Sequence, residues 1–116
     1  MMRYQELPEL VKTNVRGGVG EIRCRDYLSG APDGLAFAQL GMNEMQPGST
    51  IPEHTHAEDA EFYFILEGQG TGLHQGQSFP VGPGDGWLCR RGETHGILNN
   101  TGQPGQILRF LSIFFK

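Results

Sequence analysis

The pattern of hydrophobic and polar residues along the chain predicts short β-strands. Apolar and β-branched residues come in runs that turn-forming segments separate, such as "SGAPDG", "QPGS", "EGQG", "GPGD" and "NNTGQPG". Beyond a short window at Glu6–Lys12, no stretch free of Gly and Pro repeats apolar residues at helical spacing. The predicted strands are Glu21–Leu28, Leu35–Met45, Ile51–Thr55, Glu61–Leu66, Thr71–Gln75, Ser78–Val81, Gly86–Cys89, Gly96–Asn99 and Gln106–Phe115.

These strands indicate a single all-β domain. The chain has 116 residues, enough for one hydrophobic core and too few for two. Eight or nine short antiparallel strands are typical of a double-sheet jelly-roll barrel, or double-stranded β-helix. We place this barrel in residues 21–116 and expect residues 1–20 to form an N-terminal arm. Its "RGGVG" is expected to be a flexible lead-in to the first strand.

Charge and composition argue against several classes of protein. The net charge is −4 and the basic residues are scattered, whereas binding to nucleic acid needs a clustered basic surface. No apolar run approaches the roughly 20 residues of a membrane span, and the first ten residues lack the apolar core of a signal peptide. Cys24 and Cys89 are far apart and are expected to be reduced thiols. We therefore expect a cytoplasmic protein without a nucleic-acid or membrane partner.

Two of the predicted strands are apolar on both alternating faces. They are Phe62–Leu66 and Ile107–Phe115. A strand with one face in water would alternate, so either the second sheet or a partner subunit covers the remaining face. Phe62, Phe64 and Leu66 point away from the face that carries Glu61. Two such strands in so small a domain predict a homodimer.

The histidines predict a metal site. His54 and His56 share one face of an extended chain, with Cα atoms roughly 6.6 Å apart. Glu61 opens the next strand after a polar turn, and His95 follows a glycine turn further along. Alone, each residue is also explained as a turn, surface or strand-end residue. Together, three imidazoles and one carboxylate suit a divalent transition metal (Mn, Fe, Co, Ni or Zn) better than Ca or Mg.

The chain resembles the cupin family in two motifs. The first motif is Gly, five residues, His-x-His, three or four residues, Glu, six residues and Gly, which Gly48, His54, His56, Glu61 and Gly68 match. The second is Gly, five residues, Pro-x-Gly, two residues, His, three residues and Asn, which Gly84, Gly92, His95 and Asn99 match. Arg90 stands where the second motif has Pro. The resemblance covers Gly48 to Asn99 and implies a jelly-roll barrel with a metal bound by His54, His56, Glu61 and His95. Cupins are also commonly dimers.

The resemblance implies metal binding without implying a reaction, because this fold carries many activities. We expect a protein that binds a small polar molecule near the metal. The alternative is a metal-dependent enzyme: a dioxygenase, or less readily a sugar-phosphate isomerase or a decarboxylase. Four polar residues in otherwise apolar strands are candidates for the pocket, namely Gln39, Tyr63, His74 and Arg109. His74 either lines the cavity or lies exposed on a hairpin.

Overall fold

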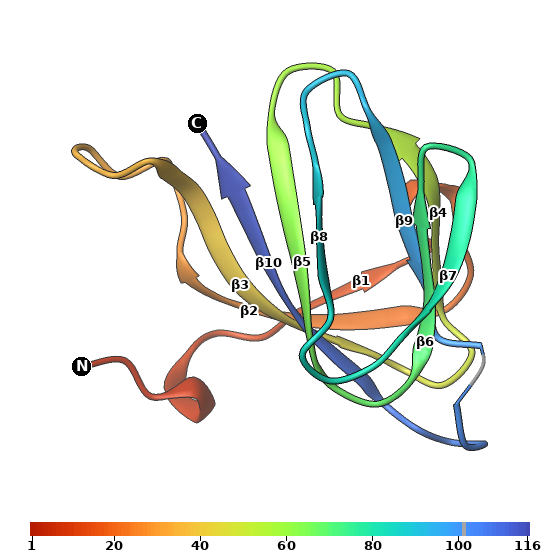
Figure 1. Cartoon of the computed structure of the whole chain (residues 1–116). Helices are drawn as coiled ribbons and strands as arrows, with labels where there is room; N and C mark the ends of the chain where they lie inside the picture. Colours follow the sequence, from red (N-terminus) through yellow and green to blue (C-terminus); the bar gives the residue numbers. More distant parts are fainter. Residues whose placement is uncertain (101) are drawn as a thin grey trace.

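The structure is a computed structural model that describes residues 1–100 and 102–116. Two antiparallel sheets face each other, one of six strands and one of four (Figure 1). The larger sheet has the order β1-β2-β3-β10-β5-β8 and the smaller one β4-β9-β6-β7. The strands are β1 (Leu10–Thr13), β2 (Glu21–Leu28), β3 (Phe37–Met45), β4 (Thr50–Thr55), β5 (Ala60–Glu67), β6 (Gly70–His74), β7 (Gln77–Val81), β8 (Gly86–Cys89), β9 (Thr94–Leu98) and β10 (Leu108–Phe115). The all-β jelly-roll barrel predicted from the sequence is confirmed.

The core lies between the two sheets. In β5, burial alternates, so that Glu61, Tyr63 and Ile65 are buried while Phe62 and Phe64 on the other face stay partly exposed. A strand puts successive side chains on opposite faces, which explains this division. The buried hydrophobic cluster takes residues from both sheets: Ile22, Cys24, Met45, Ile51, Tyr63, Ile65, Val81, Ile97, Leu108 and Phe110.

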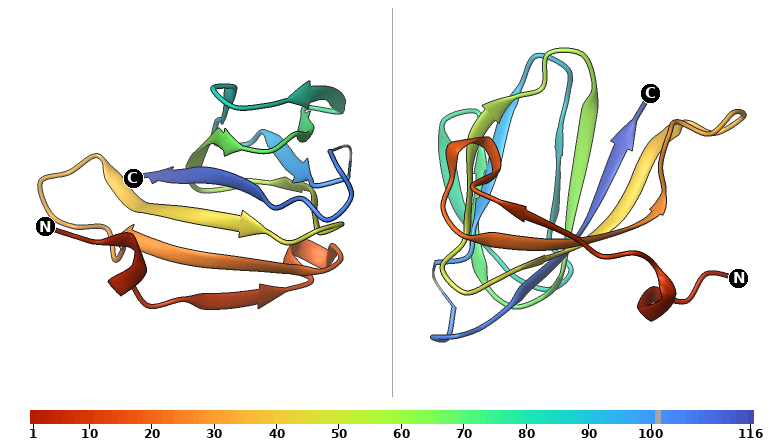
Figure 2. Two further views of the ribbon diagram at one scale, coloured as in Figure 1. Left: turned by 90° about the horizontal axis from the view of Figure 1, so that it is seen from below. Right: turned by 180° about the vertical axis from the view of Figure 1, so that it is seen from behind.

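The N-terminal segment has more regular structure than the sequence predicts. The window Glu6–Lys12 is not a helix: a 3₁₀ turn η1 (Tyr4–Glu6) precedes β1, which pairs antiparallel with β2. A second 3₁₀ turn, η2 (Val15–Gly17), folds back against β4 (Figure 2). The four residues of β1 are all exposed, and the strand exists because it pairs with β2. No helix in the described part of the chain is long and apolar enough to cross a membrane.

Candidate metal centre

Three strands bring the four predicted ligands together. His54 and His56 lie at the end of β4 and in the turn after it, and His95 pairs with His54 across β4 and β9. Glu61 reaches them from β5 in the opposite sheet. One ligand atom from each of the four residues lies within 4.8 Å of all the others, and His56, Glu61 and His95 are buried. The structure thus places the four residues as one cluster.

The nitrogen atoms of the cluster are oriented for metal binding. His54 Nδ1 lies 2.9 Å from the carbonyl oxygen of Pro52, and His56 Nδ1 lies 2.7 Å from Asp59 Oδ1. Because both partners are acceptors, each Nδ1 carries a proton, and in the neutral ring each Nε2 keeps a lone pair that a metal ion can use. A carboxylate that holds a histidine in this way is a common support for a metal ligand.

The distances at the centre of the cluster support a bound cation. His56 Nε2 lies 2.9 Å from His95 Nε2, and Glu61 Oε1 lies 3.0 Å from His95 Nε2 and 3.1 Å from His56 Nε2. Lone pairs that converge at such distances repel each other unless a proton or a metal ion lies between them. Imidazole nitrogen and carboxylate oxygen are ligands for divalent transition metals, so the residues fit such an ion.

Glu61 is held as a carboxylate. Burial alone would raise its pKa, but hydrogen bonds from His56, His95 and Ser112 outweigh burial and lower the pKa to about 2. The Ser112 hydroxyl donates to Oε2, which leaves Oε1 facing the histidines. Ser112 is a functional residue that the sequence analysis missed. Its signal was a single hydroxyl in the apolar run "FLSIFF".

The histidine rings are fixed by packing as well as by hydrogen bonds. The ring of Tyr63 stacks on His95, with centroids 4.2 Å apart and an interplanar angle of 12°. His95 Nδ1 is buried without a hydrogen-bond partner in the described residues, so this stacking helps to orient the ring. Burial lowers the pKa of His54, which favours the neutral, metal-binding form of its ring.

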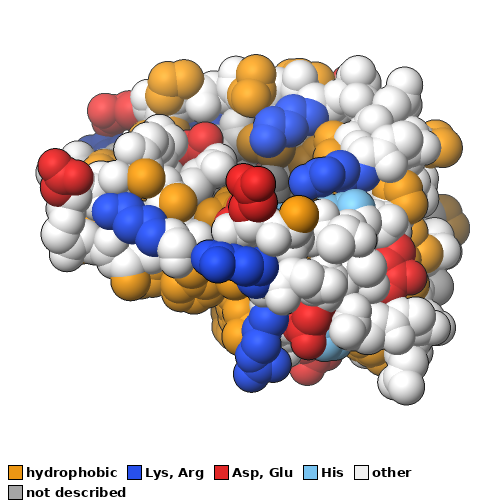
Figure 3. Space-filling view, turned by 90° about the horizontal axis from the view of Figure 1, so that it is seen from above, with side chains coloured by type: hydrophobic (Ala, Val, Ile, Leu, Met, Phe, Trp, Pro, Cys, Tyr) orange, Lys and Arg blue, Asp and Glu red, His pale blue; other side chains and the backbone are white. Residues whose placement is uncertain are grey.

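The cluster lies against a cavity of about 200 Å³ that opens to solvent. Gln39 and Tyr63 line it, as two of the four predicted pocket residues. On the face drawn in Figure 3, Lys and Arg side chains lie around a hollow together with an acidic side chain and a histidine. The cavity lining comes from both sheets and from the N-terminal segment: Lys12, Val15, Arg16, Ile22, Cys24, Asp26, Gln39, Gly41, Asn43, Ile51, His54, His56, Glu61, Tyr63, Phe110, Ser112 and Phe114.

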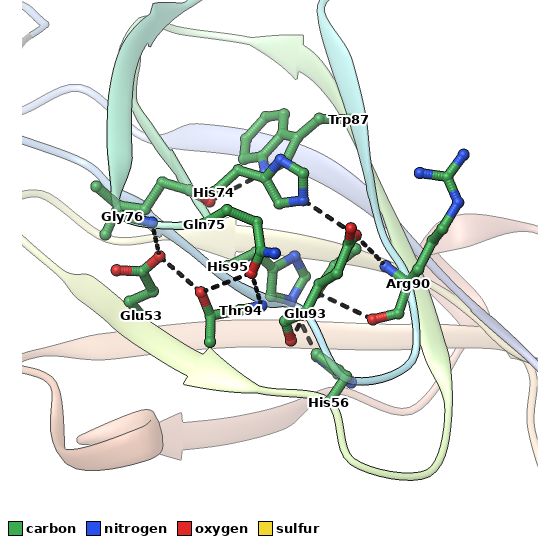
Figure 4. Close-up of polar contacts among 12 residues, drawn as sticks. Glu53, His56, His74, Gln75, Gly76, Trp87, Arg90, Glu93, Thr94 and His95 are labelled. Atoms are coloured by element: carbon green, nitrogen blue, oxygen red, sulfur yellow. Dashed lines mark hydrogen bonds and ion pairs between the residues drawn. The ribbon is translucent and has the colours of Figure 1, made fainter.

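The other two predicted pocket residues lie elsewhere. His74 Nε2 is 3.2 Å from Glu93 Oε1, in a partly exposed group of polar side chains (Figure 4). Arg109 lies near Glu44 and Glu67, at 3.6 and 3.5 Å, with its guanidinium over the ring of Tyr4. The cavity lining among the described residues includes neither His74 nor Arg109.

Arg90, which replaces the motif's proline, has a structural role in its turn. Its backbone N–H donates to Glu93 Oε1 at 2.8 Å, and the N–H of Glu93 donates back to the carbonyl of Arg90 at 2.9 Å (Figure 4). Proline has no N–H and could not make the first of these bonds. Gly92 in the same turn has a φ of +85°, a conformation that non-glycine residues rarely adopt. The turn that delivers His95 therefore uses the backbone of Arg90 rather than its charge.

The remaining motif residues and the thiols have structural surroundings. The buried Asn99 amide donates to the carbonyls of Met45, Gln46 and Gln106, at 3.0 to 3.1 Å, and thereby links the end of β3 to Gln106, just before β10. Cys24 and Cys89 are both free and buried. Burial also raises the pKa of Cys89 to about 11, so its thiol stays protonated at neutral pH.

The fold and the cluster define a β-barrel protein with a three-histidine, one-glutamate centre. The cupin domain family matches residues 41–114, and the chain belongs to the cupins. The chain is similar to an oxalate-binding protein from Thermotoga maritima, with 33% identity over 97% of this chain and 91% of the relative.

Two crystal structures show the same architecture. A predicted oxalate decarboxylase from Thermotoga maritima superimposes with a TM-score of 0.88 at 30% identity, over 99% of this chain and 97% of the other. A polyketide cyclase from Streptomyces resistomycificus gives a TM-score of 0.74 at 30% identity, over 99% of this chain and 78% of the other. The names of these relatives indicate different activities, so the fold alone does not assign one.

Proposed function

We propose that the protein binds a small dicarboxylate such as oxalate through a transition metal held by His54, His56, Glu61 and His95. The observation that carries this proposal is the convergence of the four donor atoms, three of them on buried residues, at one side of a cavity. When bound, the ion supplies a positive centre to which a carboxylate can coordinate. Similarity to an oxalate-binding protein over nearly the whole chain supports the choice of ligand.

The size of the cavity favours a small ligand. Its volume of about 200 Å³ is below the roughly 300–1,000 Å³ of pockets for drug-sized molecules. The side chains that surround the metal centre also combine apolar groups, such as Phe110 and Phe114, with the amides of Gln39 and Asn43. This lining suits a compact polar molecule with a few hydrogen-bonding atoms.

Calorimetry tests the proposal. Metal-loaded protein is titrated with oxalate, and formate and glucose 6-phosphate serve as comparison ligands. We expect saturable oxalate binding that disappears both after the metal is chelated and in a His95→Ala variant. Failure of the metal-loaded protein to bind oxalate would reject the proposed ligand.

An enzyme acting on a carboxylate is the second candidate function. The observation that favours it is Asp26, a carboxylate that lines the cavity and accepts a hydrogen bond from Gln39 Nε2 at 3.0 Å. A carboxyl group beside a substrate can act as a general acid or base. Incubation with oxalate, with release of CO₂ and uptake of O₂ both recorded, distinguishes a decarboxylase, a dioxygenase and a binding protein. Activity that Asp26→Asn abolishes without metal loss would favour the enzyme.

We also propose that the protein is a homodimer that pairs through the outer face of the larger sheet. Leu111 lies opposite Phe64, and Ile113 lies opposite Phe62, in the register of β5 and β10. Leu40 of β3 continues this apolar surface beside Ile113. A self-complementary apolar surface on one face of a sheet suits a two-fold dimer.

Light scattering tests this assembly. The expected mass is about twice the 12.8 kDa of one chain. Phe64→Asp should shift the protein toward monomer or aggregate, whereas Leu35→Asp, at an exposed position outside this surface, should leave the dimer intact. A wild-type mass of one chain at micromolar concentration would reject the dimer.

A further inference from the structure

Two basic residues of the N-terminal segment lie at the metal cavity. Lys12 in β1 and Arg16 in η2 both line it, although they precede the strands that hold the metal ligands. Lys12 pairs in register with Ile22, a buried residue that also lines the cavity. Both basic side chains are largely exposed, so they lie at the mouth of the cavity rather than at its floor.

The loop that carries Arg16 is fixed against the strand of the metal ligands. Thr50 at the start of β4 holds Val19 in both directions: its N–H donates to the carbonyl of Val19 at 2.8 Å, and its Oγ1 accepts the N–H of Val19 at 2.9 Å. A Cβ on Gly18 would lie 2.2 Å from the carbonyl oxygen of Thr50, so only glycine allows this approach. Figure 2 shows the same close packing of the loop on β4. The segment therefore holds a defined place beside β4, the strand that carries His54.

The backbone at Arg16 itself is unusual. Arg16 has a φ of +54° and Asn14 a φ of +51°, both in the left-handed region that residues other than Gly seldom occupy. Between them, the side chain of Val15 packs against the hydrophobic core. A partly buried Val15 followed by a left-handed residue turns the side chain of Arg16 to the cavity. Strained backbone of this kind persists where surrounding contacts over-determine it and is concentrated at functional sites.

The charges of these two residues are available to a ligand. None of the ion pairs in the described part of the chain includes Lys12 or Arg16. Outside the metal centre, Asp26 is the one carboxylate among the lining residues, and it accepts a hydrogen bond from Gln39. Outside the metal centre, the cavity lining thus carries two cations and one anion.

We infer that Lys12 and Arg16 form a cationic rim that holds the second anionic group of a dianionic ligand whose first carboxylate faces the metal centre. The inference rests on the proposed function and deepens it, because it makes the N-terminal segment the part that selects dianions over monoanions. An arginine fork and a lysine ammonium both bind carboxylates, and their exposed position makes the attraction sensitive to salt.

The test compares Lys12→Gln, Arg16→Gln and the double variant with Arg23→Gln. Arg23 is a matched control, because it lies beside β1 in β2, pairs with Glu21 at 2.9 Å and does not line the cavity. Metal content is measured first and should equal that of the wild type in every variant. Calorimetry with oxalate and with formate then follows, at about 50 mM and 300 mM NaCl.

We expect oxalate binding to weaken about 5-fold in Arg16→Gln and at least about 20-fold in the double variant, with formate binding changed less than about 2-fold. The loss should shrink at the higher salt concentration, and Arg23→Gln should bind as the wild type does. Unchanged oxalate affinity in the metal-loaded double variant would overturn the inference and leave the proposed function standing. No oxalate binding by the metal-loaded wild type would overturn both.

Discussion

His95 and His74 face each other across β9 and β6, yet the protein puts them to different uses. His95 is fully buried, and its Nε2 lies 2.9 Å from a second imidazole and 3.0 Å from a buried carboxylate. His74 lies at the end of β6 with 28% of its side chain exposed, and its side-chain partner among the described residues is Glu93. The comparison shows that a histidine's strand position alone does not make it a ligand. What distinguishes His95 is that a second imidazole nitrogen and a carboxylate oxygen converge on its Nε2.

Removing each histidine gives the largest expected contrast. His95→Ala and His54→Ala should lower the affinity for the metal by 100-fold or more, because each removes a ligand and leaves Glu61 buried without it. His74→Ala should leave the metal content within about 10% of wild type, since it removes only a partly exposed pair. Elemental analysis after dialysis against a weak chelator measures all three. Equal losses of metal in the three variants would contradict the assignment of His54 and His95, but not His74, as metal ligands.

The same contrast predicts a link between metal and stability. An ion that binds only the folded protein stabilises it by about 4 kcal/mol at a concentration 1,000 times its dissociation constant. For a chain of this size, stripping the ion with EDTA should lower Tm by at least about 10 °C. The His74→Ala protein should lose as many degrees as the wild type. A Tm that stays constant while the ion is demonstrably removed would break the link.

The pH dependence follows from the ligands. Hydrogen bonding to Glu61 is the main cause of the raised pKa of His56, so protons compete with the metal for this ring at a higher pH than for an ordinary histidine. Affinity is therefore highest above the pKa of His56 and falls as pH drops through it. Burial lowers the pKa of His54, so its protonation weakens binding only at lower pH. We expect the metal to dissociate between roughly pH 6 and 4. Measuring the metal content of the protein at equilibrium at each pH checks this expectation.

Glu61 makes the stability of the metal-free protein depend on pH in the acid range. Its pKa of about 2 lies below the ordinary value of 4.5, so its contribution to stability is present above pH 4.5 and is lost as pH falls toward 2. Glu61→Gln should flatten the stability of the metal-free protein in that range. Urea unfolding at several pH values checks this, and a slope equal to that of wild type would contradict it.

The smallest effect is expected from the residue that orients Glu61. Ser112→Ala removes the hydroxyl that holds Oε2 and should weaken metal binding by roughly tenfold, the lower end for a residue that supports a ligand. Ser112→Thr keeps the hydroxyl and should recover part of the affinity. Competition with a coloured chelator measures both. Equal affinities in Ser112→Ala and wild type would show that Glu61 needs no such support.

Local patterns explain how much of this molecule could be predicted from its sequence. Strands β2 to β10 lie where runs of apolar residues between turns predict them, and β2 has the predicted bounds, Glu21–Leu28. The spacing of His54, His56, Glu61 and His95 also predicts that they form one cluster, because the two cupin motifs keep these residues at fixed intervals. Strand β1 was missed because its four residues are all exposed and it forms only by pairing with β2.

Contacts between distant residues account for what the sequence did not predict. Lys12 lies at the cavity because β1 pairs with β2, and Arg16 because the loop after β1 packs on Thr50, some 30 residues later in the chain. His74 pairs with Glu93 in the turn before β9, and Gln39 lines the cavity while Arg109 does not. The alternation of apolar and polar residues along a strand does not predict which of these polar side chains lines the cavity.

A crystal structure with oxalate, measured with X-ray energies on either side of the metal absorption edge, tests the central claim most directly. The account predicts one anomalous peak about 2.0–2.2 Å from Nε2 of His54, His56 and His95 and from Oε1 of Glu61, with oxalate density between that peak and the side chains of Lys12 and Arg16. A peak on other residues, or a fully loaded metal with oxalate bound outside the cavity, would contradict it.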